Sequence, residues 1–208
     1  MNNETKRTRL TVQDMVRLSV LVAIMLLLEV TGLGMIKMPG LEITLLMVPV
    51  IVGAIVMGPA TGAILGGVFG ATSFLQAVQG TSAMGAALFA YSPVGSFVVC
   101  FVARVLVGLC CGLVYQGMRK ILPGKEKVCA AVGGFSAAFL NTVFFMGFLV
   151  LLFYGSPYVQ GMVAALGVSN PLAFVVAVVG VQAIVEWAAC CVVAAAVTVP
   201  LRKYLKMN

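Results

Sequence analysis

The sequence predicts an all-α membrane protein, a six-transmembrane-helix bundle with both termini in the cytoplasm. Of its 208 residues, 62% are hydrophobic and only 9% are charged. Apolar runs recur along the chain that are long enough to cross a bilayer, which needs about 20 helical residues. These runs are continuous and rich in Ala, Gly, Leu and Val, whereas a transmembrane barrel has alternating segments of about 10 residues. Helices are therefore favoured.

The apolar runs form one membrane domain with a short tail at each end. We expect a basic cytoplasmic tail at 1–13, the membrane domain at 14–203 and a cytoplasmic tail at 204–208. The first run has no small-residue cleavage site, so it is predicted to be a retained span rather than a signal peptide. To within a few residues, the expected spans are 14–34, 42–58, 59–78, 93–118, 127–155 and 170–200.

The basic residues predict the orientation of these spans. They gather in three segments, at the start of the first span, between the fourth and fifth spans, and after the sixth: Lys6, Arg7, Arg9 and Arg17; Arg119, Lys120, Lys125 and Lys127; and Arg202, Lys203 and Lys206. With six spans, all three segments lie on one side of the membrane. Because positively charged loops stay in the cytoplasm, both termini are expected there.

The stretch from Val48 to Phe74 joins two apolar runs through Gly58-Pro59. Glycines recur every four residues along it, at positions 58, 62, 66 and 70. Residues spaced by four lie near one face of a helix, and small residues on that face let a neighbouring backbone approach closely. The spacing therefore predicts a tightly packed helix pair.

Polar residues inside membrane spans are costly, and so they are functional candidates. At about 1.5 Å per residue, Arg104, Asn141 and Gln182 lie roughly 18, 21 and 18 Å below the outer ends of their helices. Arg104 is predicted to meet an anionic group of a substrate, with Asn141 and Gln182 supplying amide donors and acceptors. The alternative is a structural ion pair between Arg104 and Glu186, one turn beyond Gln182.

The outer loops are rich in Gly, Ser and Pro, and they are either lids over a ligand or ordinary connectors. They span Met35 to Leu41, Gln79 to Ser92, and Ser156 to Ser169. Tyr91, in the second loop, is a candidate substrate contact, with interfacial anchoring as the alternative. Few aromatic residues occur in these loops, so an aliphatic, polar ligand is favoured over a stacked planar one.

Several classes of function are disfavoured by composition. The chain has no histidine, six cysteines without CxxC spacing and no clustered carboxylates, so neither a metal nor a cofactor is expected. Its charge of +7 is divided among three short segments, which does not suggest nucleic-acid binding. The sequence also lacks a G-x-x-x-x-G-K-[ST] phosphate loop, so an ATPase would have to be a separate subunit.

Ser19 and Ala23 place two small side chains on one face of the first span. Such a pair permits close approach of another helix. That helix is either in a partner protein or within the chain, where the glycine face would accept it.

The segment VPVIVGAIVMGPATGAILGGVFGATSF resembles the central signature of the substrate-binding S-components of energy-coupling factor (ECF) vitamin transporters. The six helices, the basic N-terminal tail and the pair Ser19 and Ala23, where the family usually has two alanines, fit the same family. ARVLVGL at Ala103 to Leu109 and NTVFFMG at Asn141 to Gly147 are most similar to the pantothenate-specific members.

The resemblance implies a high-affinity substrate-binding subunit of an ECF-type ABC importer in a prokaryotic cell membrane. Such a subunit captures a water-soluble vitamin, here expected to be pantothenate, although Arg104 would also suit lipoate or biotin. Its partners would be a membrane coupling (T) subunit, docked at Ser19 and Ala23, and two cytosolic ATPase subunits. The alternative is a self-contained secondary transporter or channel. An integral membrane enzyme is disfavoured, because the chain has no histidine and six acidic residues.

Overall fold

The computed structural model describes residues 12–32, 34–38 and 41–204, and within them all side chains except those of 35–38, 41–44, 181 and 182. Helices dominate, and one two-stranded hairpin is present. In chain order the elements are α1 (Val12–Val30), β1 (Met35–Met38), β2 (Leu41–Thr44), α2 (Met47–Val56), α3 (Pro59–Gln79), α4 (Ala83–Tyr91), α5 (Pro93–Phe97), a π-helical turn η1 (Val98–Val102), α6 (Ala103–Ile121), α7 (Glu126–Phe153), α8 (Pro157–Leu166) and α9 (Pro171–Tyr204).

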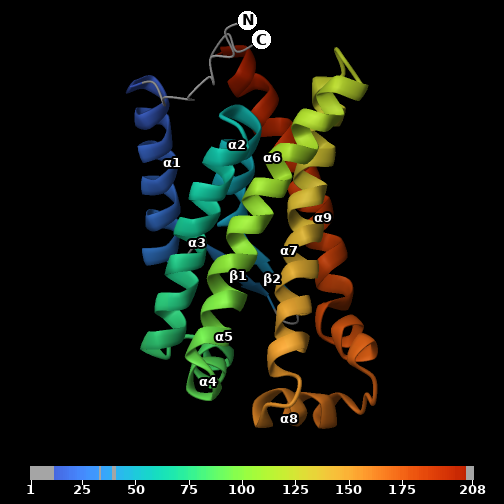
Figure 1. Ribbon diagram of the computed structural model, residues 1–208. Helices are drawn as coiled ribbons and strands as arrows, with labels where there is room; N and C mark the ends of the chain where they lie inside the picture. The colour runs from blue at the N-terminus through green and yellow to red at the C-terminus, as the bar shows by residue number, and fades with distance from the viewer. Residues whose placement is uncertain (1–11, 33, 39–40, 205–208) are drawn as a thin grey trace, which may run out of the picture.

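The long helices form an elongated bundle with two distinct ends (Figure 1). α3 runs beside α6, α7 runs beside α9, and α1 lies at the edge of the bundle. The start of α1, the end of α9 and the turn between α6 and α7 lie at the upper end in the figure, whereas the short helices α4, α5 and α8 cover the lower end. The basic residues of the α6–α7 turn and of the α9 terminus therefore share one end.

Four helices in the described part of the chain are long and apolar enough to cross a membrane: Pro59–Gln79, Pro93–Ile121, Glu126–Phe153 and Ala183–Tyr204. A fifth span is possible if Pro157–Leu166 and Pro171–Gly180, which meet at 75°, count as one. The helical membrane class is thus confirmed. Length and composition do not give the predicted six spans. α1 has three charged residues, Asp14, Arg17 and Glu29, and α2, with 10 residues, is too short to cross the membrane.

The segment predicted as a continuous span at 42–58 differs most from expectation. Leu41–Thr44 pairs antiparallel with Met35–Met38, in a register that places Lys37 opposite Glu42. Backbone groups engaged in this ladder are not available to start a helix, so α2 begins only at Met47. A helix of 10 residues is about 15 Å long, which is half the thickness of the hydrocarbon core.

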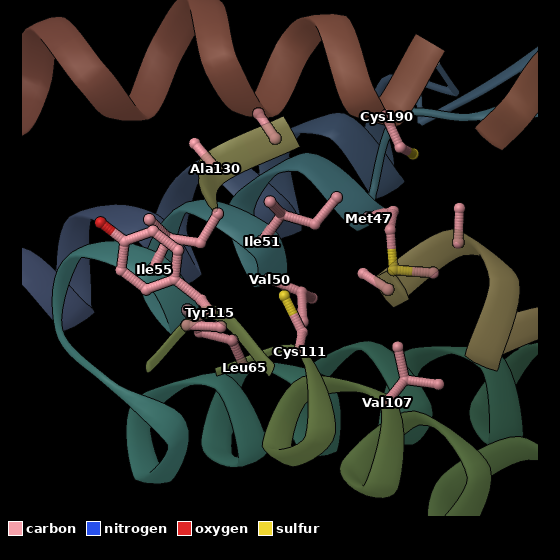
Figure 2. Close-up of a cluster of buried hydrophobic side chains, with 14 of the residues drawn as sticks. Met47, Val50, Ile51, Ile55, Leu65, Val107, Cys111, Tyr115, Ala130 and Cys190 are labelled. Atoms are coloured by element: carbon pink, nitrogen blue, oxygen red, sulfur yellow. The ribbon is translucent and has the colours of Figure 1, made fainter. Parts of the chain in front are cut away.

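α2 is nevertheless the centre of the larger hydrophobic cluster (Figure 2). Every residue of α2 except Val48 is buried, as expected for a helix that is apolar on all sides. In Figure 2 its core side chains lie among Leu65 of α3; Val107, Cys111 and Tyr115 of α6; Ala130 of α7; and Cys190 of α9. The buried Arg202 of α9 donates to the carbonyl oxygen of Ile55, 3.1 Å away, and so links α9 to the last turn of α2.

The turns follow the local sequence. Gly58 has φ of 107°, a backbone conformation that favours glycine, and Pro59 then takes the first position of α3, where its missing N–H is not needed. Two further helices start with Ser-Pro pairs. The hydroxyls of Ser92 and Ser156 accept bonds from the backbone N–H groups of Gly95 and Val159. The predicted outer loops thus contain short helices, α4 in the second and α8 in the third.

The predicted glycine face is confirmed, and its neighbour is α6. A Cβ atom added to Gly62 would lie 2.4 Å from the carbonyl oxygen of Gly108, and one added to Gly66 would lie 2.2 Å from that of Arg104. At Gly70 a Cβ would lie 2.7 Å from the Cα of Phe101. α3 and α6 therefore touch backbone to backbone. This contact occupies the face that α1 would need for the internal packing of Ser19 and Ala23.

Candidate functional site

A polar layer crosses the bundle between two hydrophobic clusters, and we define it by Arg104, Asn141, Gln182 and Glu186. The larger cluster surrounds α2, and the smaller one lies toward α4 and α8. Along η1, α6 and α7, the residues that flank the layer are Val107 and Ala138 of the larger cluster and Val99 and Met146 of the smaller. Arg104 and Asn141 thus lie between the two clusters along their helices, and the shared depth of the full set stays a prediction.

Arg104 is held by one hydrogen bond and two aromatic rings. Its Nη1 donates to the carbonyl oxygen of Val99 at 3.0 Å, within the π-helical turn that precedes α6. Its Cζ lies 4.6 Å from the ring centroid of Phe145 and 5.3 Å from that of Phe69. These rings offset part of the cost of burying the cation. The Nε group is buried and has no hydrogen-bond partner, so the guanidinium keeps an unused donor.

Asn141 contributes an unused acceptor to the same layer. Its Oδ1 atom is buried without a hydrogen-bond partner. Asn141 lies one turn before Phe145 on α7, so both share a face of that helix. Because the Phe145 ring contacts the Arg104 guanidinium, Asn141 faces the same region as Arg104. A buried polar atom left without a partner costs about 1–3 kcal/mol, which a ligand could recover.

Arg104 and Glu186 form no direct ion pair in the described part of the chain. Glu186 is buried, with 8% of its surface exposed, and it is near enough for its charge to attract that of Arg104. The structural ion pair that the sequence left open as an alternative is therefore absent here. Arg104 uses Val99, Phe69 and Phe145 instead.

The two other predicted substrate residues are placed differently. Gln182 belongs to α9 just after Gly180, where the helix backbone departs from helical angles, but its side chain lies outside the described residues. Tyr91 ends α4, is 54% exposed, and has its ring centroid 5.9 Å from that of Phe153. No contact in the described structure joins Tyr91 to Arg104 or Asn141. Tyr91 belongs to the end of the bundle that α4 and α8 cover.

Sequence reasoning missed three groups that position Arg104. Nothing in the sequence indicated the carbonyl of Val99, because an apolar run gives no sign of a π-helical turn. Phe145 had a weak signal, as it lies four residues after Asn141 in NTVFFMG. Phe69 precedes Gly70 on the glycine-rich helix, and close packing of that helix brings its ring to Arg104.

Ser19 and Ala23 lie on the outward face of α1. Both are exposed, and they line a shallow groove on the surface of α1 together with Val12, Met15, Val16 and Val20. The opposite face of α1 attaches the helix to the bundle. Met25 is fully buried there, and the amide of Gln76 on α3 donates to the carboxylate of Glu29.

The described residues contain no group of three or more His, Cys, Asp or Glu side chains that could hold a metal ion. The six cysteines are free thiols. What the bundle offers instead is a cation, an unused donor and an unused acceptor inside an apolar membrane domain. These features define a multi-pass membrane protein with a candidate binding layer for a small solute.

Comparison with known proteins gives the family. The model of the family described as "ECF transporter, substrate-specific component" matches residues 13–198, and the chain belongs to this family. It is therefore a transporter subunit rather than an enzyme. The pantothenic acid transporter PanT of Lactococcus lactis subsp. cremoris (strain MG1363) is 29% identical over 154 residues, which cover 69% of this chain and 74% of PanT.

Proposed function

We propose that this subunit captures pantothenate for ATP-driven uptake. The observation that carries the proposal is the buried guanidinium of Arg104, whose free Nε lies in one layer with the unpaired Oδ1 of Asn141. A carboxylate can accept from the guanidinium, and an amide or hydroxyl of the ligand can donate to Asn141. Pantothenate has a carboxylate, an amide and two hydroxyls. The similarity to PanT supports this choice over lipoate or biotin.

In the proposed site, Gln182 adds a second amide, and Tyr91 contacts the ligand from the end of the bundle formed by α4 and α8. The Gly180 break supports the role of Gln182, because irregular helices at membrane depth are tolerated where they line a binding site. Tyr91 has the weaker support, since its ring packs on Phe153.

Calorimetric titration of the purified subunit with pantothenate, and with the alcohol analogue that lacks its carboxylate, tests this function. We expect the acid to bind at least about 30-fold more tightly, because a desolvated charge pair contributes roughly 2 kcal/mol or more. Mass spectrometry of the small molecule that is retained in mild detergent is the complementary measurement. Equal affinity for acid and alcohol would contradict the assignment.

We further propose that the subunit crosses a prokaryotic cell membrane six times with both termini in the cytoplasm. α1 and the hairpin with α2 would then supply the first two crossings. An even number of crossings agrees with the shared end of α1 and α9 and with the basic residues there (Figure 1). Tags at each terminus should stay inaccessible from outside intact cells.

The outward face of α1 is the proposed docking site for the membrane coupling subunit, which would act with two cytosolic ATPase subunits. Replacing Ser19 or Ala23 with leucine should fill the groove and stop close helix approach. Pantothenate binding by the isolated subunit should change less than twofold, while ATP-driven uptake by the reconstituted complex falls at least about tenfold.

The matched control is Ser19→Ala, which keeps the side chain small and should retain uptake. Proteoliposomes that contain all subunits give the uptake rate, and calorimetry of the isolated subunit gives the affinity. If Ser19→Leu weakened binding as much as uptake, the groove would not be a docking surface.

A further inference from the structure

Glu186 is a buried acidic side chain to which the proposed site gives no role. It lies near the middle of α9, after the break at Gly180, with 8% of its surface exposed. Among the described residues it has neither a hydrogen bond nor an ion pair. An acidic group at membrane depth is costly, so it is expected to have a functional partner. The partner is not Arg104 in direct contact, since that pair is absent.

The packing of α7 against α9 shows what Glu186 faces. A Cβ atom added to Gly134 of α7 would lie 2.4 Å from the carbonyl oxygen of Cys190, so the two backbones touch there. Cys190 is one turn beyond Glu186 and on the same face of α9. The helices run in opposite directions (Figure 1), so one turn back along α9, at Glu186, corresponds to one turn forward along α7, at Ala138. Asn141 lies about one turn further along α7, and the bond from the indole of Trp187 to the hydroxyl of Thr142 joins the residues next to Glu186 and Asn141. Glu186 therefore faces α7 within about one turn of Asn141.

Arg104 and Glu186 thus form a basic and an acidic pole of one layer. They are not in direct contact, and the unpaired acceptor of Asn141 belongs to the same layer. When it is ionised, the Glu186 carboxylate only accepts hydrogen bonds, so it suits a hydroxyl donor. It would also repel a second carboxylate, because like charges disfavour each other in a medium of low dielectric constant.

We propose that Glu186 determines specificity by accepting a hydrogen bond from a ligand hydroxyl, at the pole opposite Arg104. The site then selects monocarboxylates that carry a hydroxyl donor and rejects dicarboxylates. This inference rests on the proposed function, because both use the same layer. Arg104 recognises the acid end of the ligand, and Glu186 recognises its alcohol end.

A cycle of four titrations tests the proposal. Pantothenate and its analogue with both hydroxyls replaced by hydrogen are titrated into wild-type protein and into Glu186→Gln. A hydrogen bond to a charged group corresponds to about 10- to 100-fold in affinity. We expect removal of the hydroxyls to weaken binding by that factor in wild type and by less than about threefold in Glu186→Gln. The same factor in both proteins would overturn the proposal.

Thr142→Val is the matched control. The Thr142 hydroxyl already donates its only proton to the carbonyl of Ala138 and accepts from the indole of Trp187, so it is engaged within the bundle. This variant should show the wild-type hydroxyl effect. Wild-type protein could bind pantothenate more tightly than its alcohol analogue and yet bind the analogue without hydroxyls as tightly as pantothenate. That result would refute the role of Glu186, while the proposed function would stand.

A measurement on wild-type protein alone covers the case in which Glu186→Gln does not fold. An analogue with its terminal hydroxymethyl group oxidised to a carboxylate should bind at least about 100-fold more weakly than pantothenate, because it brings a second negative charge to Glu186. Binding of this dicarboxylate with the affinity of pantothenate would also overturn the proposal.

Discussion

Replacing Arg104 with alanine is expected to lower pantothenate affinity at least about 30-fold and to leave a folded protein. Truncating one partner of a buried charge pair costs about 2–5 kcal/mol, and the ligand carboxylate would lose its cation. The fold should survive because Arg104 makes one side-chain hydrogen bond, to Val99, and no ion pair that its removal would break. Calorimetry gives the affinity, and thermal unfolding in detergent checks the fold.

Arg104→Lys separates charge from geometry. A lysine keeps the positive charge but loses the planar fork that holds a carboxylate at two points, so it should also bind poorly. Arg119→Ala is the control, since Arg119 lies in the last turn of the same helix, outside the polar layer. A well-folded Arg104→Ala variant with normal pantothenate affinity would exclude Arg104 from the site.

Gly66→Ala is expected to have the largest effect on stability. The new Cβ atom would lie 2.2 Å from the carbonyl oxygen of Arg104 and 2.9 Å from its carbonyl carbon. Both are backbone atoms, so α3 and α6 would have to move apart along their whole contact. Overpacking of a core typically costs 1–3 kcal/mol, and we expect a fall of about 3 kcal/mol in the free energy of unfolding.

The substitution should also weaken pantothenate binding, because the clash occurs at the backbone of Arg104 itself. Gly117→Ala, in α6, is the control: a Cβ atom there meets nothing within 4 Å. Alanine favours a helix over glycine by up to about 1 kcal/mol, so this variant should be as stable as wild type or more so. Equal unfolding curves for the two variants would disprove the close contact of α3 and α6.

Much of the fold and part of the candidate site could be predicted from the sequence. Hydropathy indicates membrane helices because the bilayer acts on every residue of a segment alike. The four-residue glycine spacing predicted a tight helix contact, since it needs only the geometry of one helix. The depth of Arg104 and Asn141 followed from counting residues along each helix. None of these predictions required knowledge of which helices are neighbours.

The family, the membrane class and the glycine face were thus determined by the sequence alone. The tertiary structure decided which groups meet. The glycines contact α6 rather than α1, and Arg104 contacts Val99 and two phenylalanines rather than Glu186. Two paired strands at 35–38 and 41–44 and a short central helix at 47–56 replace the predicted second span. Each depends on the rotation and pairing of elements far apart in the chain. Periodicity within one segment carries no information about its partners, because the same apolar or small face can pack against any neighbour of matching shape.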